Sequence, residues 1–112
     1  MGLDIYFNAR KTEHHEPEEI AYWRKHNRLM GAVSKVLGVE LENCVDYTLT
    51  VDHLDQLIDL ATNHDLHEPT SGFFWGSPSP YYDEDREGDL FRFNKAKALI
   101  EEGYEVTFYA WW

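Results

Sequence analysis

The last nine residues of the chain alternate between two sets of side chains, and this alternation restricts the fold more than any other feature. Every second position is apolar or aromatic, at Tyr104, Val106, Phe108, Ala110 and Trp112. A period of two is typical of a β-strand with one buried face. The intervening positions hold two further aromatic residues, so we expect the second face to be aromatic as well. The chain must therefore form a sheet that includes its C-terminal segment.

Two other segments, residues 3–8 and 44–49, alternate in the same way. Leu3, Ile5 and Phe7 would share one face of the first segment, and polar or tyrosine side chains would share the other. Together with the C-terminal segment, these patterns predict three strands, one at each end of the chain and one near its middle.

Residues 50–63 have the clearest helical pattern. Thr50 is a favourable N-cap, and Asp52 would lie in the first turn, where the helix dipole favours an anion. The apolar residues that follow have the spacing i, i+3, i+4, i+7 of an amphipathic helix, at Leu54, Leu57, Ile58 and Ala61. The outer face of this helix would be acidic.

Two more helices are expected from their start and stop signals. Pro17 predicts the start of one, because proline is tolerated at the first helical position, and Gly38 predicts its end. Asp89 predicts the N-cap of the other helix, Leu90 to Glu102, and Gly103 predicts its end.

These elements follow the order β-α-β-α-loop-α-β, which predicts a two-layer α+β domain. The sheet would have three or four strands with three helices mainly on one face, and residues 1–112 would form one domain. A hydrophobic content of 43% with 15% aromatic residues is typical of a globular chain. The sheet face without helices is expected to show Tyr6, Tyr109 and Trp111.

Residues 64–88 contain Pro69, Pro78 and Pro80, which break any long element. An irregular connection of this length is uncommon in a compact domain unless it is functional. Its aromatic centre, Ser71–Ser77, would form either a short edge strand or a loop held in place by its rings.

Negative charge is concentrated in one part of the chain. The segment Glu40–Phe91 carries thirteen acidic residues and one base, Arg86, whereas the rest of the chain sums to +1. Net acidity argues against direct binding to nucleic acid, because that affinity comes mainly from Lys and Arg. It favours a protein partner with a basic surface, including one whose nucleic-acid groove the chain would occupy as a DNA mimic. The alternative is that the acidity only maintains solubility.

Nothing in the sequence predicts export or a membrane partner. The first residues form neither a basic region nor a long apolar run, so no signal peptide is expected. No apolar run approaches the ~20 residues that span a bilayer. Cys44, the only cysteine, cannot form an intramolecular disulfide, and we expect it to be buried. These features predict a soluble protein of a reducing cytoplasm.

No set of residues predicts catalysis, a metal site or a cofactor. Of six histidines, His64 and His67 lie close together, but no HExxH motif or cysteine cluster accompanies them. The segment Asp83–Asp89 places carboxylates at three positions of a calcium loop, yet Asn94 stands where an EF-hand needs a bidentate Glu. Phosphate-binding and nucleophile motifs are also missing. We therefore expect no catalytic residue, and favour a non-enzymatic protein over an enzyme.

The segment Tyr22–Asn27 is the most distinctive part of the first half, and it has two interpretations. One is a small-ligand pocket between the first helix and the Ser71–Ser77 loop. That pocket would be lined by Arg24, His26, Asn27 and Ser71. The other is structural, with Trp23 as a core anchor and Asn27 holding a loop by hydrogen bonds.

Five motifs occur along the chain: Met1–Tyr6, Tyr22–Asn27, Asn43-Cys44, Ser71–Ser77 and the terminal Trp111-Trp112. With these motifs, the chain resembles a family of small acidic proteins encoded by bacteriophages and prophages. The resemblance covers nearly the whole chain. It implies a phage accessory protein in the cytoplasm of a bacterial host, and it transfers no catalytic residue.

Three functions remain open. The first is inhibition of a host nucleic-acid-handling or defence complex by protein–protein interaction, as an anti-CRISPR protein does. Its docking residues would be Asp52, Asp55, Asp59, Phe73, Phe74, Trp75, Asp83, Glu84, Asp85 and Glu87. The alternative is small-ligand binding or an enzymatic activity in the pocket described above. The third is a homo-oligomer that buries the aromatic sheet face.

Overall fold

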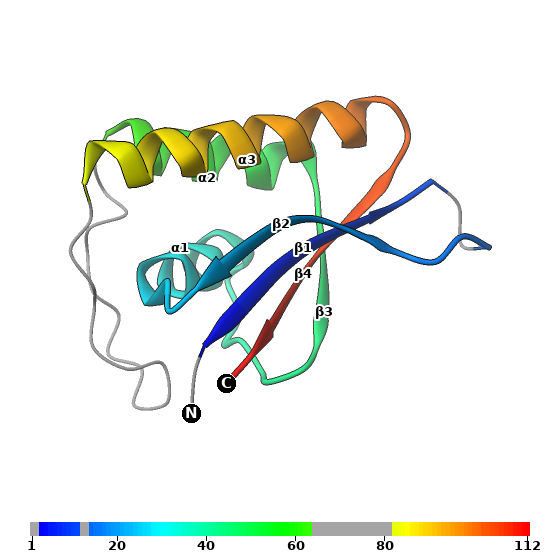
Figure 1. Cartoon of the computed structure of the whole chain (residues 1–112), viewed down its shortest axis with the longest axis horizontal. Coiled ribbons are helices and arrows are strands. Elements are labelled where there is room, and N and C mark those ends of the chain that lie inside the picture. Colours follow the sequence, from blue (N-terminus) through cyan, green and yellow to red (C-terminus); the bar gives the residue numbers. More distant parts are fainter. Residues whose placement is uncertain (1–2, 12–13, 64–81) are drawn as a thin grey trace.

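The computed structural model describes residues 3–11, 14–63 and 82–112. In chain order, the elements are β1 (Asp4–Arg10), β2 (Glu18–Arg24), α1 (Asn27–Leu37), β3 (Asp46–Leu49), α2 (Val51–Thr62), α3 (Asp83–Glu101) and β4 (Glu105–Trp111) (Figure 1). Four antiparallel strands with three helices packed on them make an α+β fold, which confirms the expected fold class. None of the helices in these ranges combines the length and apolarity needed to cross a membrane.

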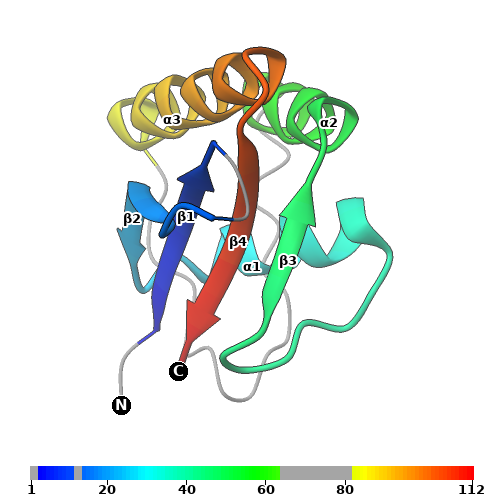
Figure 2. The same ribbon diagram turned by 90° about the vertical axis from the view of Figure 1, so that its right-hand side faces the viewer.

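The two strands from the ends of the chain form the centre of the sheet. The strand order is β2-β1-β4-β3, and β1 pairs with β4 along its whole length, from Asp4 opposite Trp111 to Arg10 opposite Glu105. Figure 2 shows β1 and β4 side by side between the two outer strands. The alternation at both termini thus predicted the two strands on which the rest of the sheet is assembled.

One face of the sheet carries the hydrophobic core. Ile5, Phe7 and Phe108 are fully buried on this face. The ring of Phe7 lies 4.8 Å from that of Trp23, edge to face, and 6.2 Å from that of Phe93 on α3. Aromatic pairs at these separations stabilise a core beyond the area they bury. The core therefore joins β1, β2, β4 and α3 directly.

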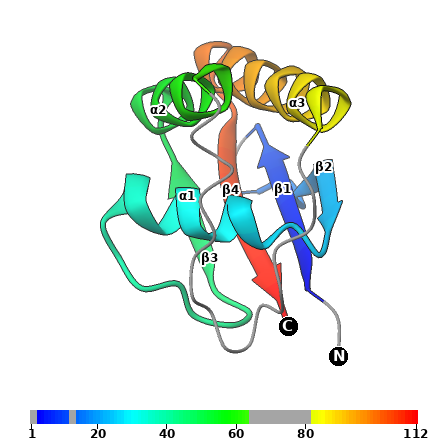
Figure 3. The same ribbon diagram turned by 90° about the vertical axis from the view of Figure 1, so that its left-hand side faces the viewer.

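The helices form the second layer. Figures 2 and 3 show α1 lying across one face of the sheet, while α2 and α3 run side by side across one end of it. The colours in Figure 1 show that α2 and α3 are antiparallel. Lys97 Nζ of α3 lies 2.7 Å from Asp55 Oδ1 of α2, so an ion pair joins the two helices.

The opposite face of the sheet is aromatic, as expected. No helix stands in front of it in Figure 2. The Tyr6 ring lies 5.1 Å from that of Tyr22 and 6.1 Å from that of Tyr109. Trp111, farther along β4, is exposed.

The prediction of a helix that starts at Pro17 is wrong for the first half of that helix, because residues Glu18–Arg24 form β2 instead. Ala21 and Trp23 are buried while Tyr22 and Arg24 are exposed, which is a period of two. Aromatic and β-branched residues favour strands, and pairing with β1 satisfies the backbone hydrogen bonds. Tertiary pairing therefore overrides the helical start signal of a proline.

The third helix begins seven residues earlier than expected, at Asp83 and not at Leu90. The Tyr82 N–H donates to Asp85 Oδ2 at 2.9 Å. Three acidic residues in the first turn are favoured by the helix dipole. Asp89, expected as the N-cap, is instead a buried residue inside the helix.

The signals that frame α2 and the end of α3 are confirmed. Thr50 Oγ1 accepts from the His53 N–H, and His53 Nδ1 accepts from the Thr50 N–H, each at 3.1 Å, a reciprocal capping box. Leu54 is fully buried, in line with the apolar spacing of this helix. Gly103 follows α3 with φ of 98°, a conformation that favours glycine.

The Asn43-Cys44 motif closes the end of the sheet. The Cys44 N–H donates to the Ala110 carbonyl at 2.9 Å. The Asn43 side chain accepts from the Trp112 N–H at 3.0 Å and donates to the Trp112 carbonyl at 3.1 Å. Cys44 is exposed, so the expectation of a buried thiol is wrong. Its φ of 61° turns the chain before β3, which begins at Asp46.

Candidate functional site

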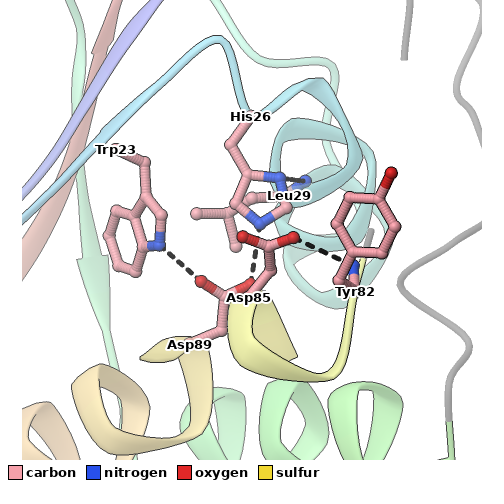
Figure 4. Close-up of polar contacts among 6 residues, drawn as sticks. All are labelled: Trp23, His26, Leu29, Tyr82, Asp85 and Asp89. Carbon is pink, nitrogen blue, oxygen red and sulfur yellow. Dashed lines mark hydrogen bonds and ion pairs between the residues drawn. The ribbon is translucent and has the colours of Figure 1, made fainter. Parts of the chain in front are cut away.

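A charged residue, Asp89, lies in the core where α3 meets the end of β2. Only 2% of its surface is exposed. The Trp23 indole N–H donates to Asp89 Oδ1 at 2.6 Å, and His26 Nε2 lies 2.7 Å from Asp89 Oδ2 (Figure 4). A buried carboxylate is tolerated only when its oxygens are paired in this way.

The second hydrogen bond of His26 identifies its tautomer. Nδ1 accepts from the Leu29 N–H at 3.4 Å and thereby caps the first turn of α1. The proton therefore sits on Nε2, which donates to Asp89. Both ring nitrogens are engaged, so the imidazole has no free lone pair with which to act as a general base. His26 and Trp23 instead fasten α3 to the β2–α1 junction.

A cleft of about 500 Å³ opens beside this contact. One wall is the continuous segment 22–28, which spans the end of β2, the turn and the start of α1. The other wall is formed by the first half of α3, with Glu84, Asp85, Gly88, Asp89 and Arg92.

Four positively charged side chains line the cleft, although the whole chain has a net charge of −11. They are Arg24, Lys25, Arg28 and Arg92. The Arg92 guanidinium carbon lies 5.5 Å from the centre of the Trp23 ring, within cation–π distance. Lys25 has φ of 59°, and its N–H donates to the Leu3 carbonyl at 2.7 Å. A left-handed conformation is uncommon for lysine and marks a turn held by its surroundings.

Three of the four residues predicted for a pocket line this cleft. Arg24 is exposed, His26 is largely buried, and Asn27 is 1% exposed. Ser71, the fourth, lies outside the described residues. The described wall facing them belongs to α3, which the sequence did not assign to the pocket.

Sequence analysis did not assign Arg92, Gly88 and Asp89 of α3 to the site, nor Lys25 and Arg28 of the facing wall. Asp89 is four residues before Phe93 and seven before Ala96, so it occupies the buried stripe of α3. This spacing is visible in the sequence, but the sequence analysis interpreted Asp89 as an N-cap and not as a buried helical residue. Gly88, a glycine inside a helix, was a second signal of a close approach.

The predicted acidic docking residues lie on α2 and α3. Asp52 and Asp59 are exposed on α2, and Asp83, Glu84, Asp85 and Glu87 are exposed at the start of α3. Asp55 is partly covered by its ion pair with Lys97, and this contact raises the pKa of Lys97 above its ordinary value. Phe73, Phe74 and Trp75 lie outside the described residues. Together, α2 and α3 carry nine Asp or Glu and four Lys or Arg.

Two exposed aromatic residues accompany these carboxylates. Phe91 on α3 is 73% exposed, and Tyr82, at the N-cap of α3, is 68% exposed. Neither was singled out in the sequence. Exposed aromatic rings offer apolar contact area to a partner.

The acidic stretch of the sequence does not form one surface. Glu40 and Glu42 precede β3 and Asp46 is its first residue, whereas α2 follows the other end of that strand. A four-residue strand is about 13 Å long. The carboxylates therefore divide into a group at the start of β3 and a group on α2 and α3.

No group of three or more His, Cys, Asp or Glu that could hold a metal occurs in the ranges 3–11, 14–63 and 82–112. His64 and His67, the pair with the closest spacing, lie outside these ranges. Comparison with protein-family models, with curated proteins and with solved structures found no match.

Proposed function

We propose that the protein acts by protein–protein interaction, with the outer surface of α2 and α3 docking against a basic partner. The observation that carries this proposal is the combination of exposed carboxylates on both helices with the exposed ring of Phe91 on α3. Carboxylates steer a basic partner, and a desolvated aromatic ring supplies contact energy.

The arrangement also supports a specific kind of partner. The two helices carry an excess of five negative charges, whereas α1 carries Arg28 and Lys35 and no acidic residue. The surface of α2 and α3 is therefore more negative than that of α1, and a negative surface is complementary to a basic groove. A host protein that handles nucleic acid has such a groove, and the chain would inhibit it by occupying the groove in place of DNA or RNA.

The test begins with capture of partners from a bacterial lysate, followed by binding measurements with the purified partner. Binding should weaken as salt increases, because screening acts on exposed charges. The D59K/E87K double variant should bind at least tenfold more weakly, and F91A should weaken binding without changing its salt dependence. Glu18 and Glu19 on β2 are also exposed, so E18K/E19K is the control with the same charge change.

Competition distinguishes an inhibitor of nucleic-acid binding from other interaction proteins. Duplex DNA and this protein should exclude one another from the partner. A partner that binds both together would refute the mimic, and equal loss of binding in D59K/E87K and E18K/E19K would refute docking through α2 and α3.

A further inference from the structure

Arg92 lies in the cleft, and no described residue forms an ion pair with it. A side-chain Cβ at Gly88 would come within 2.9 Å of Arg92 Nη1, so the absence of a side chain there makes room for the guanidinium. The other side of the group faces the Trp23 ring. Among the described residues, no ion pair within 4.0 Å includes Arg92. Glycine destabilises a helix interior relative to alanine. Gly88 therefore lowers the stability of α3 but leaves space for the Arg92 guanidinium.

The facing wall presents two more cations. Arg24 and Lys25 are exposed, and neither takes part in an ion pair within 4.0 Å in the described ranges. The first turn of α1 also lines the cleft, through Asn27 and Arg28. The start of a helix adds a partial positive charge.

The carboxylates in the cleft are mostly engaged elsewhere. Asp89 uses one oxygen for Trp23 and the other for His26. Asp85 Oδ2 accepts from the Tyr82 N–H. Glu84 is exposed at the margin. Four cationic side chains thus line the cleft with three carboxylates, so its lining has a net positive charge although the chain is acidic.

We propose that this cleft binds a small phosphate-bearing molecule. Guanidinium groups match the geometry of phosphate oxygens and remain charged at every relevant pH. A volume of about 500 Å³ lies within the range of small-ligand sites and exceeds what one phosphate group fills. The ligand is therefore an organic phosphate whose phosphate contacts Arg92, Arg24 and Lys25.

The test is titration of ¹⁵N-labelled protein with inorganic phosphate, pyrophosphate and a nucleoside 5′-monophosphate, each against potassium chloride of matched ionic strength. The Trp23 indole N–H and the Gly88 amide should shift with the phosphates and not with chloride. Tighter binding of the nucleotide than of inorganic phosphate would identify an organic phosphate as the ligand. Tighter binding of inorganic phosphate would overturn that part of the proposal.

Variants make the test specific. G88A should displace the Arg92 guanidinium and weaken binding at least fivefold without lowering the melting temperature, and R92Q should weaken it at least tenfold. K35Q removes the same charge from an exposed position at the end of α1 and should leave binding unchanged. E84Q should strengthen binding, because it removes a repelling carboxylate from the cleft margin.

Two results would overturn the proposal. One is the absence of phosphate-specific shifts at Trp23 and Gly88. The other is equal weakening by R92Q and K35Q, which would indicate general charge attraction. D59K/E87K changes the outer surface and not the cleft. This variant should lose partner binding and keep phosphate binding, so the two proposals can fail independently.

Discussion

Replacement of Asp89 tests how the cleft and α3 are held together. Asp89→Ala removes the acceptor of the Trp23 indole N–H and the partner of His26. The substitution leaves two buried N–H donors without an acceptor, and each unsatisfied donor costs about 1–3 kcal/mol. We expect a loss of ~4 kcal/mol in the free energy of unfolding, a large part of the ~5–15 kcal/mol typical of a domain.

Asp89→Asn should have a smaller effect, of about 1–3 kcal/mol, for a reason that depends on the His26 tautomer. The amide oxygen can still accept from Trp23, but the amide nitrogen then faces the protonated Nε2 of His26. Moving that proton to Nδ1 would point it at the Leu29 N–H. Either tautomer leaves two donors facing each other.

Urea denaturation followed by tryptophan fluorescence measures both variants. With a slope of about 2 kcal/mol per molar urea, the alanine variant should unfold at a midpoint ~2 M lower. Asp59→Asn, at an exposed position of α2, is the control and should stay within about 0.5 kcal/mol of the wild type. A loss of less than ~1 kcal/mol for Asp89→Ala, or wild-type stability of Asp89→Asn, would refute this account of the contact.

Three further predictions concern the core, a helix cap and the open sheet face. Phe93→Ala should cost about 3–5 kcal/mol in denaturant unfolding, because the ring is fully buried against Phe7 and Trp23; a smaller loss would show that the core collapses around the cavity. Thr50→Ala should cost ~1 kcal/mol through loss of the α2 cap, whereas Thr50→Ser should keep most of it. The Tyr22 hydroxyl donates to Asp4 at 2.6 Å, and this hydrogen bond raises the pKa of Tyr22. The contact therefore contributes stability below the unfolded-state pKa near 10 and loses it as the pH rises through the higher folded-state value. Ultraviolet titration should show a phenol that ionises above its ordinary range in the wild type and returns toward it in Asp4→Asn; an unchanged titration in that variant would contradict this cause.

Much of the architecture was predictable because it depends on local periodicity. The alternation at Leu3–Phe7 and at Tyr104–Trp112 predicted the two central strands, and the Thr50 cap predicted the start of α2. In each case, the residues that form the element also carry the signal for its period and its limits. The α+β class follows from the order of such elements.

The error at Glu18–Arg24 shows where local reasoning fails. Pro17, Glu18 and Glu19 are favourable at the start of a helix. The segment nevertheless pairs with β1 and buries Trp23. The energy of that pairing comes from β1 and the core, outside the segment itself, so the helical start signal of the segment does not include it. The acidic segment Glu40–Phe91 is continuous in the sequence, but β3 separates its carboxylates into two groups.

The sequence by itself determined the class of the fold, its central strands, its amphipathic helices and an excess of negative charge. These properties depend on residue type and spacing within one segment. Only the tertiary structure decided that Asp89 lies inside α3 against Trp23 and His26, and that Arg92 lies opposite Arg24 and Lys25 in a cationic cleft. Those contacts join residues more than sixty positions apart, and their geometry exists only after the sheet and the helices have packed.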